Sequence, residues 1–310
     1  MNLIKKVINN PVDSIIFIIT YSGLRKLITD KLYLKFLWWL HYRKRLNLKS
    51  SEKFTEKLQW LKLYDRNPIY TSMVDKYSVK DIVRDKIGEE YIIPTLGIWD
   101  KPELINWQSL PDKFVLKTTH GGGNKGVIIC KDKANLDKEY IIKRLNQAIK
   151  QNPYIKLVEW PYKNIPHRII AEELLEVPDK LSLTDYKIYC FNGIPKYIQV
   201  IQDRNSKETI DFFDTKWVHQ SFVGLNPNCK NADKIPSKPK NISDMLEKAM
   251  ILAKNIPFIR VDFYNIDGKI FFGELTFYPA SGFGKFTPES IDFDFGKLLE
   301  LPINKATVYK

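Results

Sequence analysis

Apolar and polar positions divide the chain into a helical N-terminal part and a strand-rich remainder. Up to about residue 60, apolar residues recur at helical spacing among basic ones, and a helical stretch at 77–87 stops at Gly88, a typical C-cap residue. Runs rich in β-branched and aromatic residues predict strands at 113–117, 126–130, 168–175, 186–191, 196–201, 258–263 and 269–274. Helical spacing returns at about 136–151, 244–254 and 288–299, with Ser243 as a candidate N-cap. Because strands and helices alternate without a regular strand–helix–strand repeat, we expect an α+β fold with mainly antiparallel pairing.

Two of the predicted strand pairs are hairpins. Their turn signals are Asn192-Gly193 and Asp267-Gly268. In the second hairpin a two-residue turn would place Asp262 opposite Gly273, whereas a three-residue turn or a bulge would place Asp262 opposite Glu274, with both carboxylates on one face. We predict the odd-length loop.

Asp262 and Glu274 are candidate ligands of Mg²⁺. This hard cation takes carboxylate oxygens and normally also phosphate oxygens and water. Arg260 lies two residues before Asp262 and therefore on the same strand face, which favours a charged site. The alternative interpretation is two solvated acids on an exposed sheet.

A glycine-rich loop at 117–126 is the second candidate site. Glycine allows close approach of the backbone, so the N–H groups of this loop can point at phosphate oxygens. The candidate contacts are Gly121, Gly122 and Gly123, with Thr118, Thr119 and His120 as further donors and Lys117 as a phosphate-neutralising cation. The loop joins two strands, unlike Walker and dinucleotide motifs, which lead into a helix. With the paired acids it suggests an enzyme that uses a nucleoside triphosphate; the alternative is a surface turn.

Charge and cysteine content narrow the class of protein. The 310 residues carry 49 Lys and Arg against 36 Asp and Glu, and this net charge of +13 favours anionic partners such as nucleotides, acidic polysaccharides, anionic lipid or nucleic acid. The three cysteines, Cys130, Cys190 and Cys229, form no Cys-x-x-Cys pair, so neither a zinc site nor a disulfide scaffold is indicated. Cys130 and Cys190 lie in predicted strands, where we expect buried thiols, and a reducing cytoplasm fits.

No segment of the sequence is long enough to span a bilayer. The longest apolar run, 14–24, has about half the required length, and no signal-peptide cleavage site follows it. The stretch 32–46 combines aromatic residues with a basic cluster. Two interpretations stay open: a helix packed on the chain's own core, or peripheral contact with the anionic inner face of a membrane.

Four motifs, in order, resemble the TupA-like ATP-grasp family of capsule and teichuronopeptide biosynthesis. They lie at 75–77, 114–124, 185–193 and 273–282, and the resemblance covers roughly residues 50 to 300. It implies an ATP-grasp fold, in which two α+β subdomains sandwich ATP. The implied organisation is a basic helical region at 1–60, a preceding segment at 61–112 and the ATP-grasp domain at 113–302.

The resemblance also implies roles for individual residues. For ATP they are Lys76 and Lys117 at phosphates or adenine, Glu172, Glu173 and Leu175 in the hinge that reads the adenine edge, Asp185 at the ribose and Lys187 at a phosphate. Asp262 and Glu274 would hold Mg²⁺, and Arg260 would steady the transferred phosphoryl group. Thr276 stands where the wider superfamily usually has Asn as a further metal ligand, and a hydroxyl is a weaker ligand.

The reaction implied by the resemblance is an ATP- and Mg²⁺-dependent ligation. A carboxylate is first converted to an acyl phosphate, and an amine then displaces phosphate to form an amide. We expect a carboxylated, acidic sugar or polysaccharide precursor and an amino acid or other amine as substrates, and no nucleic-acid partner. A glycosyltransferase is the main alternative, supported by Asp292-Phe-Asp, although these acids fit the surface of the predicted C-terminal helix. A phosphotransferase acting on a glycan is the other.

Overall fold

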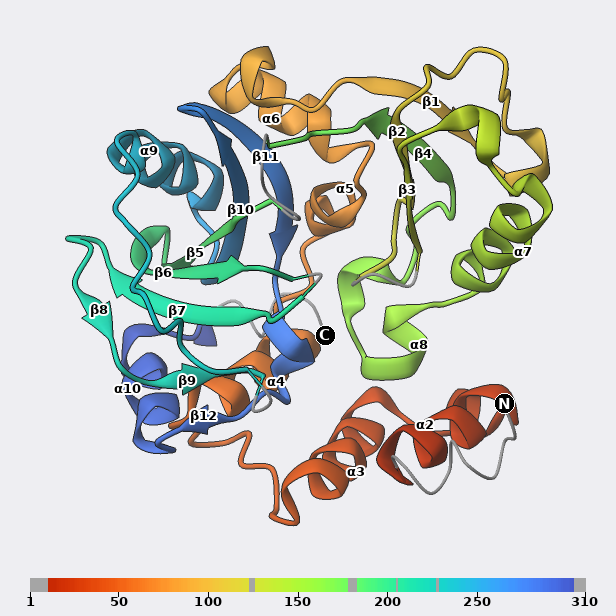
Figure 1. Cartoon of the computed structure of the whole chain (residues 1–310). Helices are drawn as coiled ribbons and strands as arrows, with labels where there is room; N and C mark the ends of the chain where they lie inside the picture. Colours follow the sequence, from red (N-terminus) through yellow and green to blue (C-terminus); the bar gives the residue numbers. More distant parts are fainter. Residues whose placement is uncertain (1–10, 123–125, 178–182, 205, 227–228, 304–310) are drawn as a thin grey trace.

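Two antiparallel sheets form the framework of the protein (Figure 1). The computed structural model describes residues 11–122, 126–177, 183–204, 206–226 and 229–303. The first sheet has the order β1-β4-β2-β3, with β1 (Thr95–Trp99), β2 (Phe114–Thr118), β3 (Val127–Cys130) and β4 (Ile169–Glu173). The second has the order β11-β10-β5-β6-β7-β8, with β5 (Asp185–Phe191), β6 (Ile194–Gln202), β7 (Thr209–Asp214), β8 (His219–Gln220), β10 (Phe258–Ile266) and β11 (Lys269–Thr276). A short third sheet pairs β9 (Val223–Gly224) with β12 (Phe286–Thr287).

Helices surround these sheets. The α-helices are α2 (Pro11–Tyr21), α3 (Asp30–Tyr42), α4 (Phe54–Tyr64), α5 (Ile69–Val74), α6 (Val79–Ile87), α7 (Lys138–Ile149), α8 (Pro153–Leu157), α9 (Ile242–Ala253) and α10 (Ser290–Leu298). Helices α2 to α6 precede the first strand in the chain, and α7 to α10 lie between or after the strands. The 3₁₀ helices are η1 (Leu24–Leu27), η2 (Glu89–Tyr91), η3 (Pro102–Leu104), η4 (Lys133–Asn135), η5 (Trp160–Tyr162) and η6 (Pro279–Gly282). The predicted α+β class with mainly antiparallel pairing is therefore confirmed.

The β10–β11 hairpin corrects the predicted turn and confirms the predicted pairing. Asp267 and Gly268 form a two-residue turn, because both take the positive φ values, 50° and 85°, that a type I′ turn requires. The predicted odd-length loop is wrong. Asp262 nevertheless lies opposite Glu274, because the register shifts after Asp262 and leaves Gly273 as the extra residue of a β-bulge. Glycine suits this position, since a Cβ atom there would lie 3.1 Å from the carbonyl oxygen of Asp262.

The first sheet has one apolar and one charged face. Phe114, Leu116 and Ile169 point into a core that Leu145 of α7 completes. Because successive strand residues point to opposite faces, Lys117 lies on the other side of the sheet. On that side Glu172 pairs with Lys80 of α6 (Val79–Ile87), and Figure 1 shows α5 between the two sheets.

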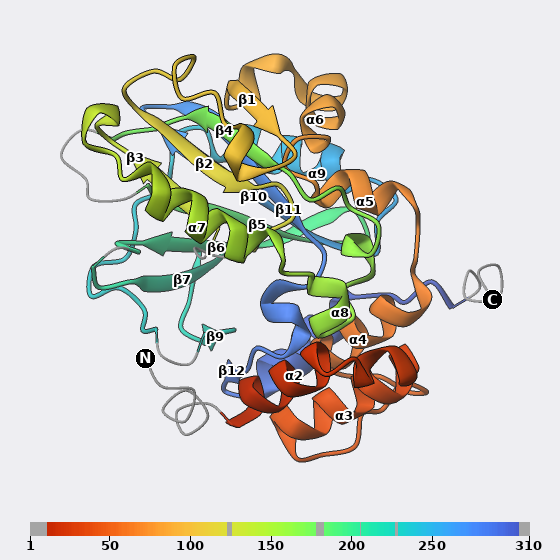
Figure 2. The same cartoon turned by 90° about the vertical axis from the view of Figure 1, so that its right-hand side faces the viewer.

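The N-terminal helices α2 and α3 form a layer at one end of the molecule (Figures 1 and 2). The buried side of α3 carries Tyr33, Leu37 and Trp38, which pack with Ile16 of α2 and with Phe283. The aromatic stripe therefore packs on the chain's own core. Among the described residues, no helix is long and apolar enough to cross a membrane.

Two expected helix features are wrong. Asp292 of α10 is not at the surface: it is 5% exposed and accepts hydrogen bonds from the backbone N–H (2.9 Å) and the hydroxyl (2.6 Å) of Thr55. It is needed there because the start of α4 brings unpaired donors into the interior. Ser243 is not an N-cap, since α9 begins earlier, after Asn241.

The predicted segment boundaries cut across elements. The boundary at residue 60 falls inside α4, and β1, which lies in the predicted 61–112 segment, is the edge strand of the first sheet.

Candidate active site

The guanidinium of Arg260 lies at the centre of the paired acids on β10 and β11. It donates to both carboxylate oxygens of Asp262, from Nε to Oδ1 at 2.6 Å and from Nη2 to Oδ2 at 2.7 Å. Nη2 also donates to Glu274 Oε1 (3.1 Å) and Thr276 Oγ1 (3.0 Å). The hydroxyl of Thr276 in turn donates to Glu274 Oε1 at 3.1 Å. Four residues predicted for the phosphoryl and metal site thus form one hydrogen-bonded cluster.

Strand β5 adds a second cation and a third carboxylate to this cluster. Lys187, opposite Asp262 in the sheet, forms an ion pair with it, and the Lys187 ammonium lies 3.5 Å from Asp185 Oδ1. Arg204 pairs with the other oxygen of Asp185 at 3.0 Å. Asp185 and Lys187 were both predicted; Arg204 was not, because a single basic residue in a polar turn carries no signal.

Lys76 connects the paired acids to the glycine loop. Its ammonium donates to the carbonyl oxygen of Gly121 at 2.5 Å and lies 3.9 Å from Glu274 Oε2. Its backbone N–H donates to the carbonyl of Thr119, which fixes the segment against the end of β2. Burial, chiefly, lowers the pKa of Lys76, and the charge of Glu274 opposes the shift.

On the charged face of the first sheet, Glu172 is held between two lysines. Lys117 donates to its Oε2 at 2.7 Å, and Lys80 of α6 lies 2.6 Å from its Oε1. Burial alone would raise the pKa of Glu172, but the two cations outweigh burial and lower it. Lys80 was not predicted, because a lysine in a surface-like helical pattern resembles a solvated one.

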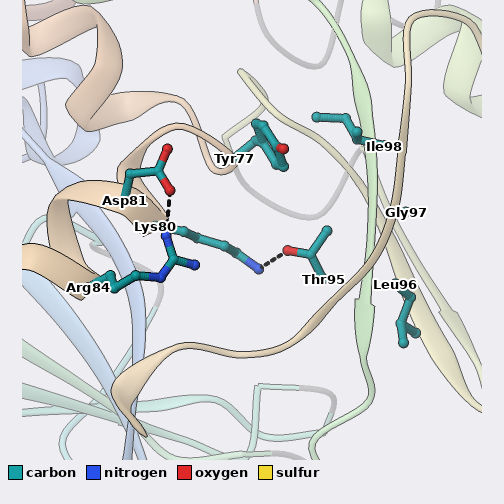
Figure 3. Close-up of a pocket in the computed structure, with 8 residues that line it drawn as sticks. All are labelled: Tyr77, Lys80, Asp81, Arg84, Thr95, Leu96, Gly97 and Ile98. Carbon is teal, nitrogen blue, oxygen red and sulfur yellow. Dashed lines mark hydrogen bonds and ion pairs between the residues drawn. The ribbon is translucent and has the colours of Figure 1, made fainter. Parts of the chain in front are cut away.

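Lys80 also lines a cavity of about 340 Å³ between α6 and β1 (Figure 3). There its ammonium donates to Thr95 Oγ1 at 2.7 Å, while Asp81 pairs with Arg84. The cavity therefore adjoins the Glu172 cluster through Lys80.

The glycine loop and the residues before it divide between two environments. Gly121 lies beside Lys76, Gly122 is exposed, and Gly123 falls outside the described residues. Thr119 and His120 are fully buried. The hydroxyl of Thr119 donates to the carbonyl of Pro166 at 3.1 Å, and the His120 ring stacks on His167 at 3.8 Å. Burial, together with the charges of His167 and Lys76, lowers the pKa of His120 to about 4, so its ring is neutral.

The predicted hinge lies at the end of β4 and just after it. Glu173 is exposed, and its backbone N–H donates to the carbonyl of Pro94 at 3.1 Å, beside the start of β1. Leu175 is half-buried. Glu172 and Glu173 are the last two residues of β4, and Leu175 lies on the chain segment that leads from the first sheet to the second.

Helix α4 holds the loop that follows Thr276. Residues 280–282 of this loop take three successive left-handed conformations, with φ of 47°, 52° and 65°, which are strained for residues other than glycine. The fully buried ammonium of Lys62 donates to both the carbonyl and the hydroxyl of Ser281 at 2.9 Å. Glu159 hydrogen-bonds to the same hydroxyl. Burial lowers the pKa of Lys62 to about 7, although the charge of Glu159 opposes the shift.

Cations outnumber anions in the assembled site. The carboxylates are Glu172, Asp185, Asp262 and Glu274, and the cations paired with them are Lys76, Lys80, Lys117, Lys187, Arg204 and Arg260. Burial would raise the pKa of Glu274, but Lys76, Lys187 and Arg260 lower it to about 2, so this carboxylate is charged at neutral pH. A surplus of cations around ionised acids suits a polyanion bound with a divalent cation.

The donor atoms also fit Mg²⁺. Among the described residues no group of three or more His, Cys, Asp or Glu side chains could hold a metal alone. Mg²⁺, however, is usually bound through one or two carboxylates together with substrate phosphates. Asp262 and Glu274, with the hydroxyl of Thr276, offer that oxygen set.

The chain is similar to known proteins in sequence and in structure. The model of the TupA-like ATPgrasp family matches residues 56–300. The endospore coat-associated protein YheC of Bacillus subtilis (strain 168) is 26% identical over 133 residues, which span 42% of this chain and 37% of that protein. Among solved structures, the D-alanine–D-alanine ligase of Helicobacter pylori is 16% identical with a TM-score of 0.46, over 84% of this chain and 70% of that one. The D-alanine–D-alanine ligase of Bacillus anthracis is 18% identical with a TM-score of 0.45, over 76% of this chain and 68% of that one.

Proposed function

Because the chain belongs to the TupA-like ATP-grasp family, we propose that it forms an amide through an acyl phosphate during the assembly of a capsular or other cell-surface polysaccharide. The family is one of ATP-dependent carboxylate–amine ligases that use ATP and Mg²⁺. The observation that carries the proposal is the pairing of Asp262 with Glu274, on which Arg260, Lys187 and Lys76 converge.

In this proposal the nucleotide lies between the two sheets. Lys117 and Lys76 contact its phosphates or adenine, and Gly122 offers its backbone N–H group. The N–H of Gly121 donates to the carbonyl of Thr118 at 3.4 Å and would have to turn from it to reach a phosphate. Glu172, Glu173 and Leu175 border the adenine, and Asp185 binds the ribose hydroxyls. His120 and Thr119, buried behind the loop, support its shape rather than donate to a phosphate.

Asp262, Glu274 and Thr276 would hold the metal. Mg²⁺ bound there supplies positive charge that neutralises the phosphate oxygens during transfer. Since Glu274 is ionised above a pH of about 2, it needs no proton release to act as a ligand near neutrality.

The first chemical step needs charge neutralisation more than a base. An oxygen of the substrate carboxylate bonds to the γ-phosphorus while the bond to ADP breaks, and a carboxylate is already a nucleophile. Arg260 presents a planar, permanently charged donor group, and Lys187 adds a second cation beside it. Both stabilise negative charge on the transferred group.

In the second step the amine nitrogen attacks the acyl carbon. The carbon–oxygen bond to phosphate breaks, phosphate leaves with the electron pair, and the nitrogen loses a proton. The products are an amide, ADP and phosphate.

The proposed substrates are a carboxylated, acidic sugar or polysaccharide precursor and an amino acid or other amine. A net charge of +13 supports an acidic glycan over a neutral one. The three buried cysteines, all unpaired as disulfides, support a reducing cytoplasm, with peripheral contact at the inner face of a membrane.

The glycosyltransferase alternative loses its local support. Asp292 of Asp292-Phe-Asp is buried and bound to Thr55, so it is not available to a sugar nucleotide or its metal.

Calorimetric titration with ATP and Mg²⁺, and separately with UDP-sugars, tests the proposal. We expect Mg²⁺-dependent ATP binding that weakens roughly 10- to 100-fold in Glu274→Ala, whereas Glu247→Ala, an exposed acid on α9, leaves it unchanged. A screen of amines and carboxylated sugars should then show phosphate release only when both are present. Binding of a UDP-sugar without ATP would overturn the proposal, and phosphate transfer to a glycan without an amine would indicate a phosphotransferase.

A further inference from the structure

Exposed large apolar side chains are concentrated in one short part of the chain, the N-terminal layer. Of the eighteen such side chains on the described part of the chain, seven fall between residues 15 and 39. They are Ile15, Phe17, Ile18, Leu24, Leu27, Leu32 and Trp39. Leu27 is the most exposed of the eighteen, at 84%. Apolar residues gathered in this way indicate an interaction surface.

The outer face of α3 mixes apolar and basic residues. Lys31, Leu32, Lys35 and Trp39 are all exposed, and at 100° per residue they fall within an arc of roughly 100°. Arg43, just after the helix, stacks over Trp39, with 4.6 Å between the guanidinium carbon and the ring centre. The opposite side of α3 is buried against Ile16 of α2 and Phe283, whereas Leu32 and Trp39 remain 61% and 48% exposed.

The preceding element continues the same pattern. In η1, Leu24 and Leu27 are three residues apart, so a 3₁₀ helix places them on one side. Lys26, between them in sequence, is exposed. Arg25, in contrast, is buried and paired with Asp30, which also accepts from Arg66, so the acid of this region is neutralised internally.

The exposed charges of the layer have one sign. Between residues 14 and 49 the exposed charged residues are all basic. They are Lys26, Lys31, Lys35, Arg43, Lys44, Arg45 and Lys49. A second copy of the chain docked on this face would bring like charges together, which is unfavourable. An anionic bilayer complements both the apolar side chains and the positive charge of this face. It accepts the apolar side chains at the acyl boundary and the cations at its phosphates.

We infer that the exposed apolar and basic residues of α2, η1 and α3, the N-terminal face, dock the protein peripherally on an anionic phospholipid bilayer. Lysine and arginine stems lie along apolar side chains and extend their charges to the lipid phosphates, and tryptophan favours the same interfacial depth. The inference deepens the proposed function, on which its biological meaning rests: it assigns the residues and the lipid charge through which the active site is brought to a glycan assembled at a membrane.

Flotation of the full chain with lipid vesicles tests the inference. Vesicles of phosphatidylcholine alone are compared with vesicles of equal parts phosphatidylcholine and phosphatidylglycerol. We expect flotation with the anionic vesicles only, and its loss at about 1 M salt, where the Debye length falls to about 3 Å. Failure to float with anionic vesicles at low salt, or equal flotation with both compositions, would overturn the inference.

Matched variants locate the surface. Leu27→Glu should lower vesicle partitioning roughly tenfold or more, whereas Leu104→Glu, at the exposed end of another 3₁₀ helix, should not. Lys35→Glu should lower partitioning roughly 30-fold, since it replaces one attractive charge by a repulsive one. Lys143→Glu, on the exposed side of α7, is its control. Equal losses in a variant and its control contradict the assignment to the N-terminal face.

Two further measurements distinguish lipid binding from dimerisation and from the ligase proposal. Light scattering without lipid should report a monomer; a dimer that Leu27→Glu dissociates would assign the face to a second copy and overturn the lipid assignment. ATP calorimetry on the same samples should give one affinity for wild type and all four variants. If wild type binds no ATP, the ligase proposal fails, and flotation still decides the lipid inference.

Discussion

The ammonium of Lys76 lies 3.9 Å from Oε2 of Glu274, which ties the segment after α5 to strand β11. The same ammonium holds the carbonyl of Gly121. One lysine therefore contacts both predicted halves of the nucleotide site, the glycine loop and the paired acids, from a segment that belongs to neither.

Replacing Lys76 should weaken nucleotide binding more than it weakens the fold. A charge-assisted hydrogen bond contributes about 1.5–3 kcal/mol, so we expect Lys76→Met to lower the affinity for ATP with Mg²⁺ roughly 10- to 100-fold by calorimetry. Lys101→Met, which changes an exposed lysine, is the control. Equal affinities in the two variants would show that Lys76 does not reach the nucleotide.

The ion pairs of Glu274 should appear in the pH dependence of stability. Its pKa is about 2 in the folded protein against an ordinary 4.5, so its charge stabilises the fold fully above pH 4.5 and this contribution is lost as the pH falls towards 2. We expect wild type to exceed Glu274→Gln in free energy of unfolding by about 1 kcal/mol near pH 6, a value reduced because the side chain is 38% exposed. Urea unfolding across this range measures the difference. A difference that does not shrink on acidification contradicts the assignment.

Lys62 should give a pH dependence of stability in the same direction, but in a higher pH range. Its pKa of about 7 lies below the ordinary 10.5, so between these values the unfolded chain binds more protons and the fold gains stability as the pH rises. The free energy of unfolding of wild type, relative to Lys62→Met, should therefore grow by about 1.4 kcal/mol per pH unit in this window. Lys131→Met, at an exposed position, should show no such growth in urea titrations. A flat difference for Lys62→Met would place a protonated lysine in the core throughout.

The two acids of the C-terminal helix provide their own matched pair. Asp292→Asn keeps one acceptor where two donors of Thr55 need partners, so we expect a loss of about 1.5–3 kcal/mol in free energy of unfolding. Asp294→Asn removes only a surface pair with Lys297 and should change it by less than about 0.5 kcal/mol. Thermal and urea unfolding compare them. If both variants fold equally well and only Asp292→Asn lowers activity, Asp292 serves the reaction rather than the fold.

Local signals predicted the hairpins and most helices. The turns at Asn192-Gly193 and Asp267-Gly268 could be predicted because positive φ at two successive residues restricts the residue types that fit. The bulge at Gly273 was less visible. A bulge is defined by the pairing with the partner strand. Both a bulge and a three-residue turn would place Asp262 opposite Glu274, and the local sequence does not distinguish them.

Long-range partners account for what the sequence did not reveal. Lys62 resembles a solvated lysine at helical spacing, yet it is fully buried because its acceptors, at Leu157 and Ser281, are 95 and 219 residues away. Asp292 was misassigned for the same reason, since Thr55 is 237 residues distant. Hydrogen bonds between residues so far apart in the chain produce no periodic pattern in the amino-acid sequence.

Helix α4 connects the N-terminal region to the loop that follows β11. Gln59 donates to the carbonyl of Gly282 at 2.7 Å, and Lys62 holds Ser281, so α4 supports the left-handed loop beyond Thr276. A chain shortened to begin at residue 61 would lose Gln59 and start inside the helix. The N-terminal region is thus not a detachable module, and an exchange of α2 and α3 between relatives would have to include α4 and the loop at 280–282.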